Sequence, residues 1–265
     1  MSYTVLFSNE TALPNPPVQN FRLVVYNMRY ATGTGATFNL PMPGAGYLRD
    51  TKVRFHRLRR YLRSLNPDIL ALVEVDSGSL RSGRINQAEA IAEALGSHGA
   101  HWECKYAPRS LLTRLPVVRK QANAFITRGG LGQVHFHYFE TGVKRLLIEL
   151  EFEGIRIFLV HLSLKYRHRH YQLSDLYDLV KTSSKPVVVA GDFNTLWGDY
   201  EIKLFSAATH LVTANTAGEP TYPSQRPRKQ LDFILASPEI EIYNFRIPHV
   251  RYSDHLPLIC DCRLH

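Results

Sequence analysis

The chain has 265 residues, of which 45% are hydrophobic and 21% are charged, and this composition excludes a disordered or fibrous protein. No apolar run approaches the roughly 18 residues that a membrane-spanning helix needs, and the N-terminus lacks the basic segment of a signal peptide, so we expect a cytoplasmic protein. Lys and Arg outnumber Asp and Glu by 32 to 23, which gives a net charge of +9. This charge indicates a polyanionic partner, such as nucleic acid, an anionic membrane or a phosphorylated small molecule, or else a surface that is merely basic.

The first half of the chain alternates strands and helices. Residues 1–20 are expected to form a proline-rich N-terminal arm, and residues 21–265 a single domain. Phe55, Leu58 and Leu62 recur at helical spacing within an arginine-rich segment, which predicts an amphipathic helix with a solvated basic face. The elements expected here are a strand at 21–27, a Gly- and Pro-rich loop at 33–46, a helix at 53–65, a strand at 68–75 and a helix at 86–95.

Strands dominate the second half. Glu153 and Gly154 fit a hairpin turn between two of them, and leucines at helical spacing mark a helix around 173–180. The other elements expected are strands at 101–106, 122–127, 143–152, 155–161, 186–191, 231–236, 242–247 and 256–263, and a short helix at 200–208. Strands with intervening helices indicate a mixed α/β layered domain.

The three cysteines are odd in number and fit no zinc-binding spacing. Cys260 and Cys262 share one face of a predicted strand, where adjacent positions rarely suit a disulfide. A reducing compartment is the simpler interpretation.

Polar residues recur near the ends of the predicted strands, out of keeping with the apolar segments beside them. Each one alone has a structural explanation, since Asp and Asn are common turn formers and a histidine is often a satisfied core residue. Their recurrence is harder to explain, because burying isolated carboxylates is costly unless cations or hydrogen bonds compensate. These residues are Asn27, Glu74, His161, Asp192, Asn194, Asp232, Asp254 and His255.

The segments that carry these residues occur in a recognisable order. They are Val25-Tyr26-Asn27, Leu72-Val73-Glu74-Val75, Val160-His161-Leu162-Ser163, Gly191-Asp192-Phe193-Asn194, Leu231-Asp232-Phe233-Ile234 and Ser253-Asp254-His255-Leu256-Pro257-Leu258. The ordered set resembles the endonuclease/exonuclease/phosphatase family of deoxyribonuclease-I-like, metal-dependent phosphoesterases, over roughly residues 21–263. The resemblance implies a four-layer α/β/β/α sandwich of two mostly antiparallel sheets flanked by helices. It places the site in a cleft where strand ends from both sheets meet.

The resemblance also implies a metal site. Glu74 would be the principal carboxylate ligand of a Mg²⁺ or Mn²⁺ ion, with Asn27 beside it and Asp254 as a further carboxylate on the metal side. Oxygen ligands agree with this implication, because a hard divalent cation prefers them and neutralises an anionic phosphodiester.

The remaining polar residues receive catalytic roles from the same resemblance. Asp192 would hold and deprotonate the attacking water, and Asn194 would orient that water or a phosphate oxygen. His255 would contact the scissile phosphate, with Asp232 fixing its tautomer, and His161 would be a second histidine facing the phosphate.

Weaker candidates adjoin this set. Arg145 is a candidate for phosphate contact, and the alternative for it is a solvated surface position. Asn123 is a second candidate, and the alternative for it is a role in a local turn. Trp197 and Tyr222 are expected to pack against a loop rather than to stack on a base.

Two basic stretches adjoin predicted site strands. One contains Lys165 and Arg167, and the other contains Arg228; both favour contact with a phosphate backbone. The loops at 33–46 and 77–84 are candidates for lids.

The leading hypothesis is therefore a divalent-metal-dependent phosphoesterase that cleaves phosphodiester bonds with activated water, acting on nucleic acid as a monomer without an obligate protein partner. One alternative is a lipid phosphodiesterase or inositol-phosphate phosphatase of the same family. Another is a non-catalytic module that binds a phosphate backbone.

Overall fold

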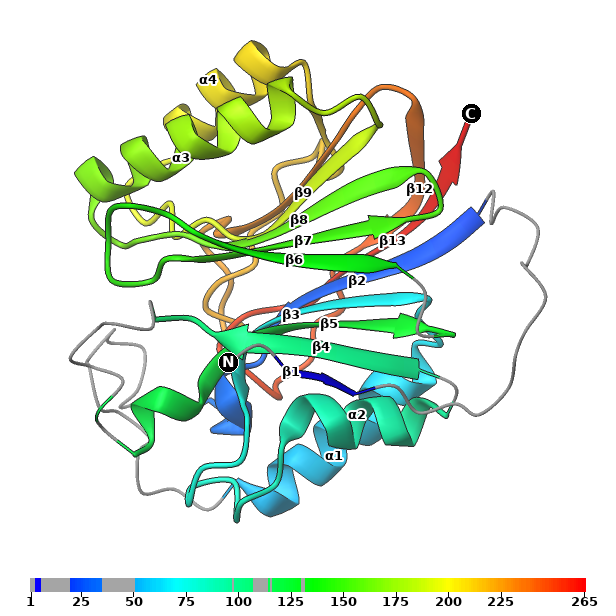
Figure 1. Ribbon diagram of the computed structural model, residues 1–265, viewed down its shortest axis with the longest axis vertical. Coiled ribbons are helices and arrows are strands. Elements are labelled where there is room, and N and C mark those ends of the chain that lie inside the picture. The colour runs from blue at the N-terminus through cyan, green and yellow to red at the C-terminus, as the bar shows by residue number, and fades with distance from the viewer. Residues whose placement is uncertain are drawn as a thin grey trace.

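Two β-sheets pack face to face in the computed structural model, and pairs of helices cover their outer sides (Figure 1). The structure describes residues 3–5, 20–34, 51–96, 98–106, 114, 116–129 and 132–265. The four layers run helix, sheet, sheet, helix. The α/β/β/α sandwich that the resemblance implied is therefore confirmed.

The first sheet has seven strands in the order β1-β4-β5-β3-β2-β13-β12 within the described residues. Its neighbours β2 and β3 are parallel, and its other pairs are antiparallel. Its strands are β1 (Tyr3–Val5), β2 (Asn20–Asn27), β3 (Ile69–Asp76), β4 (His98–Cys104), β5 (Gln121–Arg128), β12 (Ile240–Arg246) and β13 (Leu258–Leu264).

The second sheet has six strands in the order β10-β11-β9-β8-β7-β6 over the same described ranges. Its parallel pair is β8 and β9, and the other pairs are antiparallel. The strands are β6 (Gln133–Tyr138), β7 (Leu146–Phe152), β8 (Ile155–His161), β9 (Val187–Asp192), β10 (Val212–Thr213) and β11 (Asp232–Ala236).

The helices cover the two outer faces of the sandwich. Helices α1 (Lys52–Ser64) and α2 (Gln87–Leu95) lie on the seven-stranded sheet, and α3 (Tyr166–Lys181) and α4 (Tyr200–Thr209) lie on the six-stranded sheet (Figure 1). Phe55, Leu58 and Leu62 of α1 are buried as their spacing predicted. Asn86 caps α2 by accepting hydrogen bonds from the amides of Ala88 and Glu89. Short 3₁₀ turns follow β2 (η1, Arg29–Ala31) and precede β5 (η3, Val118–Lys120).

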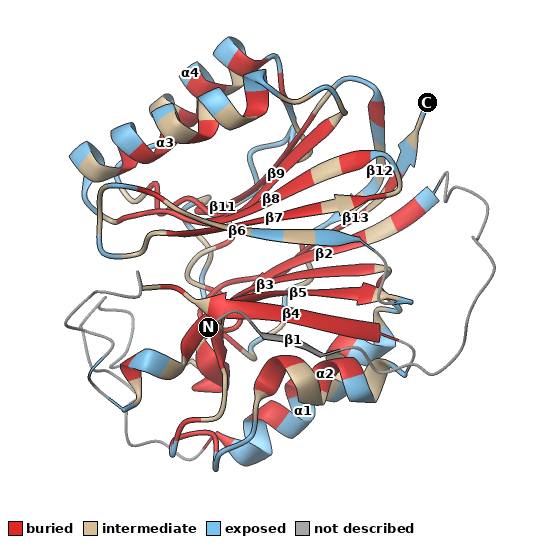
Figure 2. Ribbon diagram, viewed as in Figure 1, coloured by how far each residue is buried: buried red, intermediate tan, exposed pale blue. Residues whose placement is uncertain are grey.

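The principal core lies between the sheets and is aliphatic. Leu23, Ile69, Ile148, Ile157 and Leu258 are each completely buried there. Two further apolar clusters lie beneath the helix pairs. Figure 2 shows the strands largely buried, while the outward sides of the helices are exposed. The near-continuous burial of β3 agrees with a strand covered on both faces.

Several boundaries differ from the sequence-based expectation. Tyr3–Val5, within the expected N-terminal arm, pairs with β4 as an edge strand, while the division of the chain at residue 20 stays a prediction. The strand expected at 143–152 begins only at Leu146, because the chain bends over residues 140–143 before it. The edge strand β6 was not predicted, although Val134, Phe136 and Tyr138 alternate with polar residues and pack against the core.

The cysteines and the helices bear on two further expectations. Cys260 and Cys262 are buried side by side as free thiols, with their Sγ atoms 3.6 Å apart. None of the helices in the described ranges combines the length and the apolar character that crossing a bilayer requires.

Candidate active site

The predicted site residues converge where strand ends of the two sheets meet. In the six-stranded sheet, Asp192 at the end of β9 lies in register with His161 at the end of β8 and with Asp232 at the start of β11. In the other sheet, Asn27 ends β2 beside β3, which carries Glu74. The sheets touch here directly, because Asn27 Nδ2 donates a hydrogen bond of 2.9 Å to Asp192 Oδ2.

Asp192 occupies the centre of the site. The backbone amide of Asn194 donates to its Oδ1 at 2.9 Å, and Asn194 adopts a left-handed φ of 54° to do so. Gly191 is required before it, since a Cβ there would lie 2.0 Å from the carbonyl oxygen of Val160. Burial raises the pKa of Asp192 to about 6, although the imidazolium of His255 opposes the shift. A carboxylate with this pKa is suited to take a proton from water near neutral pH.

His255 is oriented by Asp232. Its Nδ1 donates to Asp232 Oδ2 at 2.8 Å, and Thr221 Oγ1 donates to the same oxygen at 2.6 Å. Its Nε2 lies 3.9 Å from Asp192 Oδ2. Burial disfavours the charged imidazolium, but the carboxylates of Asp232 and Asp192 outweigh it and raise the pKa of His255 to about 10. The ring therefore presents a protonated Nε2 to the site.

His161 lies on the other side of Asp192, with its Nε2 3.4 Å from Asp192 Oδ2. The ammonium of Lys144 contacts the same Nε2. Burial lowers the pKa of His161 well below its ordinary value, and the positive charge of Lys144 adds to this effect. His161 is thus held neutral, as an acceptor from Lys144.

Lys144 reaches the site because its loop is fixed. Gln172 of α3 is fully buried and donates from Nε2 to the carbonyl oxygens of Lys144 and Thr141, at 2.8 and 3.0 Å. Its Oε1 accepts from the amide of Ser163. One glutamine therefore ties the Lys144 loop to the segment that follows His161.

A bulge turns Glu74 toward the site. The register between β3 and β5 shifts between Leu72 and Val75, and Glu74 adopts a left-handed φ of 57°. Asn123 on β5 supports this conformation, because its Oδ1 accepts from the backbone amide of Glu74 at 3.2 Å. The bulge explains how one glutamate leaves an otherwise apolar strand.

Glu74 pairs with a lysine. Lys105 Nζ lies 3.3 Å from Glu74 Oε1 and also hydrogen-bonds to the hydroxyl of Tyr30. Burial opposes ionisation of Glu74, but Lys105 and Lys144 outweigh it and hold its pKa at about 2. Burial likewise lowers the pKa of Lys105 to about 8, even though Glu74 favours its charged form.

Asp254 forms an ion pair with Arg29, with 3.0 Å between Oδ2 and Nη1, and its Oδ1 accepts a hydrogen bond of 3.2 Å from the hydroxyl of Ser253. Burial raises the pKa of Asp254, although His255 and Arg29 oppose the shift. Arg29 follows Asn27 by two residues, and its backbone amide donates to Asn27 Oδ1 at 3.0 Å. The predicted metal-side residues Asn27 and Asp254 are therefore coupled through Arg29.

The donor chemistry of the site fits a hard divalent cation. Oxygen donors come from Asn27 and Asp192, which are hydrogen-bonded to each other, and from Glu74 and Asp254, whose charges act on each other. A second grouping overlaps this set: ligand atoms of Asp192, Asp232 and His255 lie within 4.8 Å of one another. His255 is protonated and engaged with Asp232, so it offers no lone pair to an ion in this grouping, whereas the oxygen donors of Asn27, Glu74 and Asp254 suit a hard divalent cation.

The weaker candidates fall into different positions. Asn123 is fully buried and positions the main chain of Glu74. The guanidinium of Arg145 hydrogen-bonds to the carbonyl oxygen of Phe139 in its own loop. Lys165, Arg167 and Arg228 are exposed on loops or helix starts next to the site strands. Direct phosphate contact by these residues stays a prediction.

Sequence reasoning missed three cations of the site, namely Arg29, Lys105 and Lys144. The neighbour of Lys144, Arg145, was singled out instead, because position within a predicted strand does not say which of two adjacent side chains faces the site. Lys105 follows the last residue of β4, and no polar motif marks it. Trp197 was expected to pack against its loop, but its side chain is 78% exposed, so that expectation is wrong. Tyr222 packs against the ring of His255, with the two ring centroids 4.9 Å apart.

The candidate lids have different outcomes. Most of the loop at 33–46 lies outside the described residues. The loop at 77–84 is anchored, because Arg81 is buried and pairs with Asp76 at 2.8 Å, while Ser79 Oγ donates to the same carboxylate at 2.6 Å.

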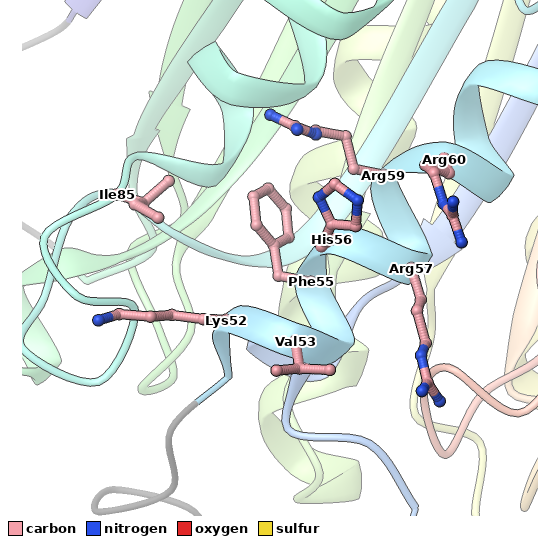
Figure 3. Close-up of a pocket in the computed structure, with 8 residues that line it drawn as sticks. All are labelled: Lys52, Val53, Phe55, His56, Arg57, Arg59, Arg60 and Ile85. Atoms are coloured by element: carbon pink, nitrogen blue, oxygen red, sulfur yellow. The ribbon is translucent and has the colours of Figure 1, made fainter.

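The basic face of α1 is solvated, as predicted, and borders a hollow of about 470 Å³ (Figure 3). The hollow is also lined by Val53 and Ile85, which are 68% and 38% exposed. The charged residues that line the hollow are Lys52, Arg57, Arg59 and Arg60.

Comparison with known proteins agrees with this geometry. The model of the Endonuclease/Exonuclease/phosphatase family matches residues 36–255. No curated protein sequence matches the chain.

Among solved structures, an endonuclease/exonuclease/phosphatase from Beutenbergia cavernae superposes with a TM-score of 0.69 at 19% identity, over 93% of this chain and 72% of that one. The human Nocturnin catalytic domain with bound sulfate superposes with a TM-score of 0.66 at 18% identity, over 100% of this chain and 98% of that one. A mannosyl-6-phosphatase of Bacteroides thetaiotaomicron superposes with a TM-score of 0.64 at 14% identity, over 92% of this chain and 99% of that one. At these identities, the superpositions show a shared fold.

Proposed function

The chain belongs to the endonuclease/exonuclease/phosphatase family, and from this premise we propose that it is a divalent-metal-dependent phosphoesterase that hydrolyses phosphodiester bonds. The proposal rests on the groups that surround the Asp192 carboxylate. One buried carboxylate with a pKa of about 6 lies between a protonated His255 and a Lys144–His161 pair. This arrangement combines a base for water with cationic donors for a phosphate.

The proposed reaction begins at Asp192, which accepts a proton from the attacking water while Asn194 orients it. His255 donates from Nε2 to a phosphate oxygen, and Asp232, which accepts from Nδ1, orients the ring and keeps it protonated. Lys144 places a positive charge on the opposite side of the phosphate. A divalent ion held by Glu74, Asn27 and Asp254 would neutralise phosphate charge and stabilise the leaving oxygen.

Nucleic acid is the proposed substrate class. The net charge of +9 and the exposed cations on both sides of the site strands support it. The test is a Mg²⁺ and Mn²⁺ titration, with an EDTA control, against single-stranded DNA, RNA, duplex DNA, abasic duplex, phosphoinositides, sphingomyelin and a chromogenic phosphodiester. Metal-dependent turnover of a nucleic acid supports the proposal, and no turnover of any substrate despite bound metal contradicts it.

A second candidate function is hydrolysis of an anionic lipid headgroup. The α1 surface favours it, because exposed Val53 of α1 and exposed Ile85 line the same hollow as the arginines of this helix, a combination that suits an anionic bilayer surface. Co-sedimentation with phosphatidylserine vesicles tests it, and charge reversal of Arg57 and Arg60 to Glu should abolish the binding. Turnover of a phosphoinositide in preference to nucleic acid would favour this candidate.

A further inference from the structure

Three aromatic side chains are unusually exposed beside the proposed site. Trp197 is 78% exposed, Tyr200 is 73% exposed and Tyr166 is 64% exposed. Large aromatic rings normally bury most of their surface, and exposed groups of them mark interaction sites. We refer to Tyr166, Trp197 and Tyr200 as the aromatic platform.

The platform is connected to the site by short segments. Trp197 follows Asn194 by three residues, so their Cα atoms lie at most about 11 Å apart. Tyr166 follows His161 by five residues and begins α3, while Tyr200 begins α4. Because β8 and β9 are parallel neighbours, both connections leave the sheet at the edge where His161 and Asp192 meet.

Two helix starts are fixed relative to each other by a buried arginine. Arg169 of α3 donates from Nε to Glu201 of α4 at 2.5 Å. Its Nη1 donates to the carbonyl oxygens of Ser163 and Leu164, at 3.1 and 2.8 Å. The guanidinium also lies 5.9 Å from the ring centroid of Tyr166. The segments that carry Tyr166 and Tyr200 are thus held together without burying either ring.

The segment that carries Trp197 lies between two basic stretches. In the sheet order, β9 has β8 on one side and β11 on the other. On the β8 side, Asn194 Nδ2 donates to the carbonyl oxygen of Leu162 at 2.8 Å, close to exposed Lys165 and Arg167. On the β11 side, Thr195 Oγ1 donates to the carbonyl oxygen of Gln230 at 2.8 Å. The exposed cations on that side are Arg226, Arg228 and Lys229.

The charge around the platform is positive. Its acidic neighbours Asp199 and Glu201 are already paired, the first with Lys203 at 3.2 Å and the second with Arg169. Lys229 donates to the carbonyl oxygen of Leu196, next to Trp197, while the other cations named above in the two basic stretches are exposed. Aromatic rings flanked by cations suit a ligand that presents flat apolar faces and negative charges in alternation. A single nucleic-acid strand has this chemistry, since its bases stack on aromatic rings and its phosphates bind Lys and Arg.

We propose that the aromatic platform stacks unpaired bases of a nucleic-acid strand whose phosphates contact the two basic stretches. The inference rests on the proposed function in that it gives the same site a substrate class, single-stranded or unpaired nucleic acid. Duplex DNA fits less well, because its bases are already stacked on one another and do not offer their faces.

The two tryptophans of the chain allow a direct test by fluorescence. Trp102 is only 4% exposed, so an added ligand that stacks on the platform quenches Trp197 selectively. The whole protein is titrated in EDTA with oligothymidylate and with an abasic oligomer of equal length, which carries the same phosphates without bases. We expect quenching by oligothymidylate, retained in Trp102→Phe and lost in Trp197→Phe.

Affinity gives the second readout, measured by anisotropy of a labelled oligomer. Stacking on one ring contributes about 1–3 kcal/mol, so Trp197→Ala should weaken oligothymidylate binding about 5- to 150-fold. The same variant should leave binding of the abasic oligomer nearly unchanged. Tyr171→Ala serves as the matched control, because Tyr171 is an exposed tyrosine more than one turn further along α3.

Three results would overturn the inference: equal quenching by the abasic oligomer, unchanged oligothymidylate affinity in Trp197→Ala, or a Trp197 response to anionic vesicles without a response to oligonucleotides. Binding in EDTA requires no turnover. The outcome is therefore separate from the proposed hydrolysis, which is followed with the chromogenic phosphodiester and Mn²⁺.

Discussion

The side-chain amide of Asn27 donates a hydrogen bond of 2.9 Å to Oδ2 of Asp192, and this contact joins strands that belong to different sheets. Asn27 ends β2 of the seven-stranded sheet, and Asp192 ends β9 of the six-stranded sheet. The proposed base and the proposed metal-side residues are therefore brought together by the packing of the two sheets. A shift of one sheet against the other would separate them.

Asp232→Asn should lower kcat about 10²- to 10⁴-fold while leaving the fold intact. The amide loses the charge that keeps His255 protonated and oriented, and Thr221 still donates to the remaining oxygen. The measurement is kcat on the chromogenic phosphodiester, with Asp178→Asn, an exposed position of α3, as the control. A loss below tenfold would show that the Asp232–His255 pair is dispensable.

Lys144→Gln should lower kcat about 10²- to 10³-fold, because it removes a positive charge next to His161 and Asp192. Arg145→Gln is the matched neighbour. Since the Arg145 side chain is bonded to its own loop at Phe139, we expect its loss to be less than tenfold. A larger effect at Arg145 than at Lys144 would assign the phosphate contact to Arg145 instead.

Glu74→Gln should weaken Mn²⁺ binding at least tenfold, measured by calorimetry on the purified protein. The carboxylate is held ionised, with a pKa of about 2, and its oxygens are the preferred donors for a hard cation. Asp232→Asn tests the alternative grouping of Asp192, Asp232 and His255 and should change the affinity much less. If Asp232→Asn has the stronger effect on Mn²⁺ affinity, the ion lies in that grouping.

Buried histidines should make the fold lose stability as the pH falls from about 6.5 toward 5, while the raised pKa of Asp192 contributes in the opposite direction over the same range. Burial lowers the pKa of His101, so the unfolded chain binds a proton more readily than the folded one. The stabilisation is fully present above about pH 6.5 and declines below it, by at most about 1.4 kcal/mol per pH unit for each such histidine. Burial also lowers the pKa of His98, which adds to the slope.

His101→Phe should reduce that slope without abolishing it. Both ring nitrogens of His101 lack a hydrogen-bond partner among the described residues, so a phenyl ring suits the position at every pH. The measurement is the urea unfolding free energy from pH 7 to 5, with exposed His56→Asn as the control. An unchanged slope in His101→Phe would show that His101 does not titrate on unfolding.

Sequence patterns predicted most of the fold because apolar spacing is a local property. The buried positions of α1 and the continuous burial of β3 follow directly from it. The edge strand β6 was missed although its pattern is local too, since Val134, Phe136 and Tyr138 alternate with polar residues and face the core. Strand β1 could not be predicted in this way, because its three residues pair with β4, which is far from them in sequence.

The carboxylates and histidines of the candidate site could be named from motifs, whereas their cations could not. Lys105 and Lys144 come from a strand end and a loop that carry no recognisable motif, and only the tertiary structure directs them to Glu74 and His161. The bulge at Glu74 is likewise set by its pairing with β5. Motifs record the residue types that the chemistry needs, but surrounding charges depend on three-dimensional packing.

The measurement that tests the central claim most directly is the rate of phosphodiester hydrolysis by Asp192→Asn with saturating Mn²⁺. The variant keeps the shape of the side chain and removes the base, so we predict a loss of about 10²- to 10⁴-fold relative to the unmodified chain, with Asp178→Asn unaffected. A loss below tenfold in Asp192→Asn, with Mn²⁺ still bound, would contradict the assignment of Asp192 as the group that activates water.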